Sequence, residues 1–201
     1  MLLVIETATP ACSIALFDGS RLVRESHAIL GRGHAERLIP MIAELVEGSR
    51  PDAILVDCGP GSFTGVRVGL AAAHGLAIGW RASLAGFSST ALIAAGAEGA
   101  PSEIGIALQG GHGELFVQSY GGEPLAARDD LRSLGPEDAA AAIAAALVLG
   151  SGAEALVRAR GFGVWAEALP RAAHAARLPA GLRNLAPDPI YGRAPDAKPM
   201  S

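Results

Sequence analysis

The sequence has few of the residues that usually bind nucleic acid or build large aromatic cores. Only 4% of its 201 residues are aromatic, and the formal net charge is −4 with a pI near 5.7. Lys and Arg form no cluster, and because phosphate contacts dominate nucleic-acid affinity, we do not expect this chain to bind nucleic acid by itself. Half of the residues are hydrophobic, which indicates a globular protein of one large or two small domains.

Long apolar runs and cysteines are scarce as well. The longest apolar stretch, residues 139–149, is too short to span a bilayer. The run Met1–Glu6 has no basic residue in front of it, so it is predicted to be a strand rather than a signal peptide. Cys12 and Cys58 fall in predicted strands, where free thiols behave as small buried hydrophobes. These features predict a cytoplasmic protein with reduced thiols and no membrane contact.

Motifs for metal binding and nucleophilic catalysis are absent. The histidines include no two that lie three to five residues apart, as a metal-binding helix would need: His27, His34, His74, His112 and His174. Ser62 lies in Gly-Ser-Phe rather than in a nucleophile elbow. We therefore predict no catalytic residue, no metal ligand and no bound cofactor for this chain.

The first half reads as a βββαβα unit, which places helices against a mixed sheet. A two-residue turn at Asp18–Gly19 predicts a hairpin. Apolar residues at helical spacing predict a helix from His34 to Glu47, in which Pro40 is tolerated if the helix begins near Glu36 or Arg37. The remaining elements are strands at 2–6, 12–17, 21–27 and 53–58 and a helix at 65–79.

The second half repeats the strand-turn-strand opening. A helix at 88–97 is followed by Gly99-Ala100-Pro101, a plausible boundary. Beyond it, strands at 103–109 and 114–120 flank a glycine-rich turn, Gly135-Pro136 starts a helix, and residues 147–149 form a strand. We predict an N-terminal lobe at 1–100 and a smaller, reduced C-terminal lobe at 101–201.

The segment Gly59–Gly69 ends an apolar strand and opens a helix. Backbone amides at a helix N-terminus suit an anion, so one interpretation is a vestigial anion loop. No lysine follows, which excludes a P-loop NTPase. The alternative is a tight turn that needs glycine only for its backbone conformation. The residues concerned are Gly59, Gly61, Ser62, Thr64, Gly65 and Arg67.

The helix after this loop carries small residues every four positions, at Ala71, Gly75 and Gly79. Glycine in a helix costs about 1 kcal/mol relative to alanine, so two on one face need an explanation. Close approach of another helix supplies one. From the sequence, that helix lies either in the same chain or in another subunit.

Two halves that each open with a hairpin are typical of the actin-like ATPase and sugar-kinase superfamily. Those enzymes need carboxylates at both hairpin turns to hold magnesium on phosphate. Here Glu6 stands at the first turn but Gln109 at the second. An ATP-dependent small-molecule kinase is therefore an alternative function, and a metallopeptidase is a weaker one.

Several motifs together resemble one family. They are Ile5–Thr9, Cys12–Leu16, His34–Met41, the Gly59–Gly69 loop, Gly86–Leu92, Gly113–Phe116 and Pro195–Pro199. The chain resembles the TsaB (YeaZ) family, almost continuously in its first half and patchily in its second. The resemblance implies an α/β, actin-like ATPase (ribonuclease H-like) fold with two related lobes, each a mixed sheet flanked by helices.

The resemblance also implies a function. TsaB members are non-catalytic subunits that pair with TsaD, which transfers a threonylcarbamoyl group to the adenosine beside the tRNA anticodon, and TsaE docks on the pair. ATP and metal are then expected on partner subunits, tRNA contact only through the complex, and a homodimer through the same face when the chain is alone. Members have been labelled glycoproteases, but nothing in this chain supports a peptidase mechanism.

By the same resemblance, two N-terminal helices, at about 36–46 and 66–79, form the partner interface. The expected interface residues are Leu38, Ile39, Ile42, Leu45, Val66, Leu70, Ala71, His74, Gly75 and Ile78. The chain departs from the family where Glu6 and Gln109 replace aspartates and where the 47–52 connection is short. These departures weaken a nucleotide site and leave the helical interface intact.

Overall fold

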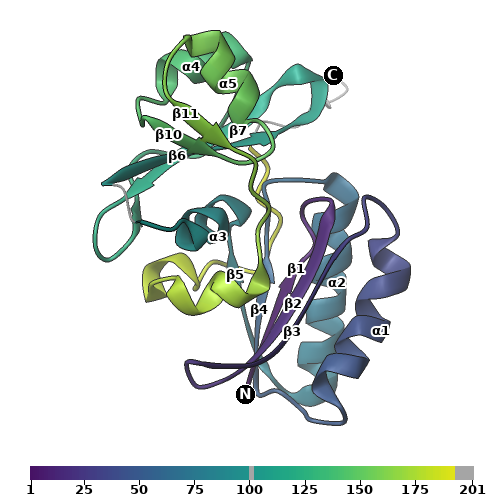
Figure 1. Cartoon of the computed structure of the whole chain (residues 1–201). Coiled ribbons are helices and arrows are strands. Elements are labelled where there is room, and N and C mark those ends of the chain that lie inside the picture. The colour runs from purple at the N-terminus through teal and green to yellow at the C-terminus, as the bar shows by residue number, and fades with distance from the viewer. Residues whose placement is uncertain (100–101, 193–201) are drawn as a thin grey trace, which may run out of the picture.

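Two mixed sheets organise the chain in a computed structural model, which describes residues 1–99 and 102–192 (Figure 1). In the first sheet the strand order is β3-β2-β1-β4-β5. Strands β1 to β3 are antiparallel, whereas β4 and β5 run parallel to β1. Their bounds are β1 Leu2–Glu6, β2 Ala11–Asp18, β3 Arg21–Ile29, β4 Ala53–Asp57 and β5 Ser83–Phe87. The predicted hairpins are confirmed, and β5 was not predicted.

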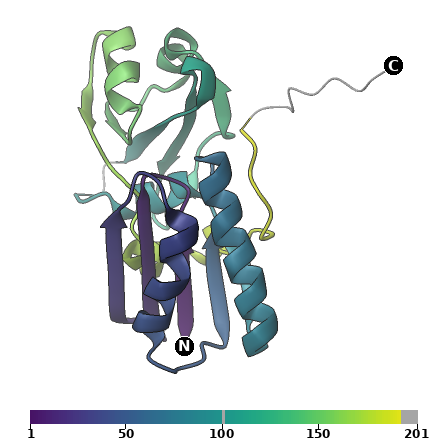
Figure 2. The ribbon, with the colours of Figure 1, turned by 90° about the vertical axis from the view of Figure 1, so that its right-hand side faces the viewer.

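Helices α1 (His34–Val46) and α2 (Phe63–Trp80) cover one face of this sheet (Figure 2). Alternation along the strands sends Leu3 and Ile5 toward these helices and Val4 to the opposite face. The α1 residues that complete this core recur at helical spacing: Leu38, Met41, Ile42, Leu45 and Val46.

Helix α1 begins at His34, as its apolar spacing predicts. The later start near Glu36 or Arg37 that would make Pro40 harmless is not observed, so Pro40 lies inside the helix. Proline has no N–H, so one intrahelical hydrogen bond is missing there. The Pro40 ring is exposed and faces away from the sheet.

The second sheet has the order β11-β10-β6-β7-β8, with β9 paired to β7. Helices α4 (Pro136–Ala142) and α5 (Ala153–Arg160) cover its outer face (Figure 1). Strands β6 and β7 form the predicted hairpin around a short turn, η1 Gly111–Gly113, whereas α5 was not predicted. The strand bounds are β6 Glu103–Gln109, β7 Leu115–Gly121, β8 Ala126–Ala127, β9 Arg132–Leu134, β10 Leu147–Leu149 and β11 Val164–Ala166.

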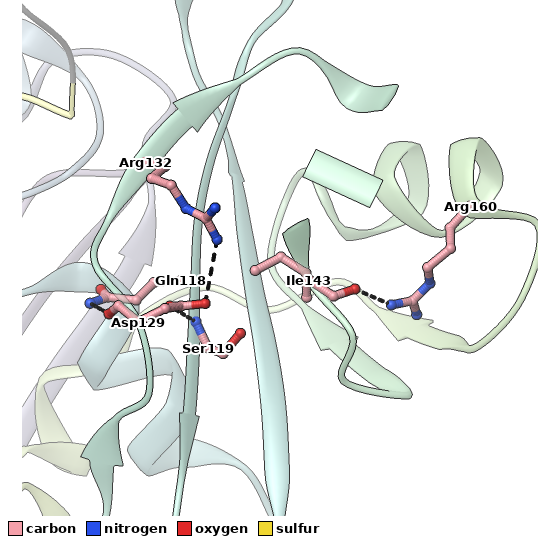
Figure 3. Close-up of polar contacts among 6 residues, drawn as sticks. All are labelled: Gln118, Ser119, Asp129, Arg132, Ile143 and Arg160. Carbon is pink, nitrogen blue, oxygen red and sulfur yellow. Dashed lines mark hydrogen bonds and ion pairs between the residues drawn. The ribbon is translucent and has the colours of Figure 1, made fainter. Parts of the chain in front are cut away.

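Backbone-directed polar contacts hold the loops of the second lobe (Figure 3). The Asp129 carboxylate accepts from the Ser119 N–H at 2.7 Å and pairs with Arg132 at 3.5 Å. Arg160, on α5, donates to the Ile143 carbonyl at 2.6 Å. These contacts fix the 129–132 segment to β7 and the end of α4 to α5.

The two sheets share one core rather than facing each other across an open gap. Helix α3 (Ser89–Gly96) and the 3-10 turn η2 (Ala172–Arg177) pack between them. Phe17 of the first sheet, Leu92 of α3 and Tyr120 of the second sheet are fully buried in this layer. The lobes are therefore joined by a continuous apolar cluster.

The last described segment returns to the first lobe. After the 3-10 turn η3 (Ala180–Leu182), Leu185 pairs with Gly86 of β5, and the Ile190 N–H donates to the Cys58 carbonyl at 2.8 Å. Figure 2 shows this segment running beside α2. The predicted boundary at residues 100 and 101 lies outside the described residues. Within the described residues, no helix combines the length and apolar character needed to cross a bilayer.

Helix α2 and the loop before it rest directly on the turn that joins β1 to β2. A Cβ on Gly61 would overlap the Ala8 carbonyl oxygen, and a Cβ on Gly65 would overlap that of Thr7. The Thr7 hydroxyl donates to the Gly65 carbonyl at 2.7 Å. These glycines therefore permit a backbone-to-backbone contact that any side chain would prevent.

Two alanine substitutions in α2 should have opposite effects. Gly65→Ala should lower the free energy of unfolding by about 1–3 kcal/mol, because the added methyl group overlaps backbone that has no room to move. Gly75→Ala, at a position with open space, should raise it by up to about 1 kcal/mol through helix propensity. Urea denaturation measures both, and equal effects would contradict this packing.

Candidate functional site

The glycine-rich loop is held from both sides by the first lobe. The Ser62 N–H donates to the Ala8 carbonyl at 2.6 Å, and the Ser62 hydroxyl accepts from the Gly65 N–H at 3.2 Å, which caps α2. Gly59, whose φ is +96°, accepts at its carbonyl from the Ser89 N–H at 3.0 Å. Close packing thus explains these glycines without a bound anion.

Arg67, the cation of the predicted anion loop, is engaged by neighbouring groups. Its guanidinium donates to the Phe63 carbonyl at 3.0 Å and to the Tyr191 hydroxyl at 2.5 Å. It also stacks on the Phe63 ring at 3.3 Å from the centroid. Thr64 is exposed on the first turn of α2. An anion at this helix end would have to compete with Tyr191 for the arginine.

A cavity of about 890 Å³ lies between the lobes beside this loop. Residues 8–10 and 61–63 line it from the first lobe, 108–112 from the second, and 189–192 from the returning segment. Gln109 is in the lining, but Glu6 is not: its side chain is sealed beneath the turn. No carboxylate is present among the described lining residues, so a magnesium–phosphate complex finds no acidic ligand there.

Glu6 and Asp57 form a buried carboxyl pair that sequence analysis missed. Both side chains are at most 1% exposed, at the ends of the adjacent parallel strands β1 and β4. Burial raises the pKa of Glu6 well above its usual range, with the charge of Asp57 adding to it, and burial raises the pKa of Asp57 to about 7. The one indication of this pair in the sequence is Asp57 itself, an acidic residue at the end of the otherwise apolar run 53–57.

His112 lines the interlobe cavity, whereas the other histidines have structural surroundings. The His34 ring lies 2.9 Å from the Ala11 carbonyl, and the His74 ring lies 3.2 Å from the Pro187 carbonyl. Burial lowers the pKa of His27 and of His174. Among residues 1–99 and 102–192, no three His, Cys, Asp or Glu side chains converge in a way that could hold a metal ion. Both cysteines are free and buried.

Five predicted interface residues lie in the chain's own core: Leu38, Ile42, Leu45, Val66 and Leu70. Each is no more than 6% exposed. Their side chains face the sheet, because the apolar stripe of each helix is what anchors it there. Little of these side chains is exposed, although Ile42 also lines the shallow groove between α1 and α2, and their contact with a partner stays a prediction.

The other five point away from the sheet. Ile78 is 81% exposed, Ile39 is 49% exposed, and Ala71, His74 and Gly75 are exposed as well. A Cβ on Gly75 or on Gly79 would meet nothing within 4 Å. The outward strip of α2 formed by Ala71, His74, Gly75, Ile78 and Gly79 is called the small-residue face below. Among residues 1–99 and 102–192, nothing lies where a side chain on either of its glycines would begin.

A shallow groove of about 350 Å³ lies between the C-terminal ends of α1 and α2. Its lining residues include Ile39, Ile42, Val46, Leu76, Trp80 and Arg50. Between Arg67 and Arg81, α2 carries no charged residue, and His74 is its one titratable side chain. The face and the groove together make an apolar surface with a hollow wide enough for a side chain.

Sequence comparison relates the chain to proteins of one tRNA modification system. Residues 28–157 match the family model of TsaD, tRNA N6-adenosine threonylcarbamoyltransferase. The tRNA threonylcarbamoyladenosine biosynthesis protein TsaB of Escherichia coli (strain K12) is 35% identical over 59% of this chain and 54% of its own length. TsaB of Haemophilus influenzae is 43% identical over 39% of this chain and 35% of its own length. The chain thus spans about half or less of these curated relatives.

Solved structures extend the likeness to nearly the whole chain. YeaZ from Pseudomonas aeruginosa has a TM-score of 0.80 and 27% identity, covering 94% of this chain and 98% of its own. A second P. aeruginosa structure, described as similar to peptidase YeaZ, has a TM-score of 0.81 and 28% identity, covering 96% and 99%. EutJ from Carboxydothermus hydrogenoformans, at 14% identity and a TM-score of 0.51, shares the fold alone.

These likenesses confirm the predicted fold class, a ribonuclease H-like, actin-like arrangement of two mixed sheets flanked by helices. The motif at 195–199, which contributed to the resemblance, lies outside the described residues. The structure places two of the positions at which the chain departs from the family pattern. Glu6 is buried in the first lobe, and Gln109 lines the cavity.

Magnesium and ATP should not stabilise this chain, because the cavity lacks an acidic ligand and Arg67 is engaged. A nucleotide present at 100-fold its Kd would stabilise the fold by about 2.7 kcal/mol, which shows clearly in a melting curve. We expect an unchanged Tm with millimolar Mg-ATP. A raised Tm that Arg67→Ala abolishes would instead support the kinase alternative.

Proposed function

Because this chain belongs to the TsaB (YeaZ) family, within the TsaD-type family whose model it matches, we propose that it is a non-catalytic scaffold subunit in tRNA threonylcarbamoyladenosine biosynthesis. In this proposal it pairs with a TsaD-type subunit, which carries the catalytic groups and transfers the threonylcarbamoyl group. The small-residue face of α2 is the observation that carries the proposal.

Two exposed helical glycines support a docking role. Each costs about 1 kcal/mol of helix stability relative to alanine, and neither relieves a clash with any described part of the chain. A surface without side chains lets a partner backbone approach closely, so the loss of stability in the free chain is offset when a helix packs there. Ile78, 81% exposed beside the glycines, would be buried by the same contact.

The second helix and the groove enlarge the surface. Ile39 and Pro40 of α1 are exposed, and Ile39 lines the groove between the helices together with Leu76 and Trp80. A specific interface of standard size covers roughly 800 Å² per partner, which two helices of this length can provide. The matching helices of a related subunit, folded in the same way, have the shape to complete a four-helix contact.

The remaining roles in the complex follow from the same family. We propose that TsaE docks on the pair, that ATP and metal are bound by the partner subunits, and that tRNA is reached only through the complex. The absence of a basic cluster in the sequence agrees with indirect tRNA contact. In the cytoplasm without its partner, the chain should pair with itself through the same face.

Gly75→Arg should separate this subunit from its partner without unfolding it. Arginine is a good helix former and the site is open, so the free chain should keep its fold. A charged side chain on the small-residue face should weaken binding by roughly 30-fold or more, the effect of a central hot spot. Co-purification and calorimetry with the TsaD-type subunit of the same organism measure this.

Gly181→Arg is the matched control, because Gly181 is also exposed and its Cβ direction is also open, but it lies in η3 away from the α1–α2 surface. It should bind at wild-type affinity. Wild-type affinity of Gly75→Arg would exclude this face as the docking surface.

A further inference from the structure

The buried pair of Glu6 and Asp57 has an unusual balance of hydrogen bonds. The Glu6 Oε1 atom accepts from the Ala8 N–H at 2.8 Å. The Asp57 Oδ1 atom accepts from the Gly59 N–H at 2.7 Å and from the Ser89 hydroxyl at 2.9 Å. Within the described part of the chain, Glu6 Oε2 and Asp57 Oδ2 are buried without a partner. Each carboxyl group therefore has one satisfied and one unsatisfied oxygen.

The strand register brings these two groups together. Strands β1 and β4 are parallel neighbours with Ile5 opposite Val56, so Glu6 and Asp57 are the next step along the same ladder. Adjacent strands are about 4.8 Å apart, and paired residues point to the same side of the sheet. That side is the α3 side, because Val4 and Leu55, two residues earlier on each strand, pack there.

Two ionised carboxylates cannot be stable in this place. The pair lies in a site closed to water, and among the described residues no ion pair reaches either group. Two like charges at this distance, each stripped of solvent, shift the equilibrium toward binding of a proton. One proton between the unsatisfied oxygens would give each of them a hydrogen-bond partner and remove one charge.

We propose that Glu6 and Asp57 share a single proton between Oε2 and Oδ2, and that this proton fixes three segments as one unit. Glu6 holds the turn at Thr7–Ala8, Asp57 holds the loop at 57–62, and Ser89 adds the N-terminus of α3. The same turn supports α2 and lines the interlobe cavity. The shared proton is thus a pH-sensitive contact beneath both α2 and the interlobe cavity.

Other titratable groups around the pair keep one protonation state through neutral pH. Burial raises the pKa of Cys12 on β2 to about 11, with the charge of Glu6 adding to it. Burial also raises the pKa of Cys58 and of Tyr120 on β7 to about 12. These three groups remain neutral up to mildly alkaline pH.

Three more charged groups act from outside the site. Arg37 on α1 acts on Cys12, and Asp188 of the returning segment acts on Cys58. Asp129 beside β7 acts on Tyr120. None of them forms an ion pair with Glu6 or Asp57 in the described structure, so the shared proton has no cation in contact to replace it.

The sign of the pH dependence follows from the raised pKa of both groups. The unfolded chain loses these protons near pH 4, whereas the folded chain keeps one of them up to about pH 7. The folded state therefore binds one proton more in this window, and its stability falls as pH rises, by up to about tenfold in the folding equilibrium constant per pH unit.

Asp57→Asn tests the shared proton. The asparagine side chain still accepts hydrogen bonds from Gly59 and Ser89 and can donate one to Glu6, but it does not titrate. Between pH 5 and pH 7, the folding equilibrium constant of the wild type should fall by up to about tenfold per pH unit relative to that of the variant. Glu6→Gln should behave in the same way. Glu44→Gln, which removes an exposed carboxylate of α1, is the control and should follow the wild type.

Infrared spectroscopy of the wild-type chain gives a readout that does not depend on any variant folding. A carbonyl stretching band of a protonated carboxylic acid should be present at pH 6.5 and disappear at alkaline pH. Where the variants fold, the band should be missing from both. The proposal is overturned by the absence of that band in the wild type, or by a wild-type pH dependence that matches Asp57→Asn.

Discussion

The contact between the start of α2 and the turn at Thr7–Ala8 is the constraint on which the first lobe depends. Gly61 and Gly65 bring backbone against backbone, and Gly69 makes room for the Thr7 hydroxyl. This contact sets the angle at which α2 leaves the sheet, and therefore which residues face inward and which face out. It also seals Glu6 beneath the turn and leaves Arg67 at the edge of the cavity.

The glycines of this region serve two distinct purposes, which the sequence alone does not separate. Gly61, Gly65 and Gly69 are needed inside, because a Cβ would overlap the neighbouring turn, whereas Gly75 and Gly79 face open space. Spacing in the sequence identified both sets as unusual but could not say what each one touches. Which atoms lie next to each glycine is known only from the folded chain. Those neighbours distinguish an anion loop from close packing and from a docking face.

Most of the first lobe was predictable because its signals are local. The hairpin turn at Asp18–Gly19, the apolar periodicity of α1 and the buried run of β4 each specify an element without reference to the rest of the chain. Strand β5 and helix α5 were missed, since their short segments lack such signals. Half of the expected interface residues are buried in the chain's own core, because amphipathic periodicity marks the face that anchors a helix to its own sheet. Asp57 was missed because its partner, Glu6, is 51 residues away and meets it only through strand pairing.

The two sides of the first sheet have different roles. The α3 side joins the lobes through a continuous core above a carboxyl pair, and on the α1–α2 side the small-residue face is exposed within the described part of the chain. The docking role of α1 and α2 can be measured by hydrogen–deuterium exchange of this chain, alone and with the TsaD-type subunit. Added protection should be confined to peptides from α1 and α2, with α4 and α5 unchanged. Protection of α4 and α5 with none on α1 and α2 would contradict this role.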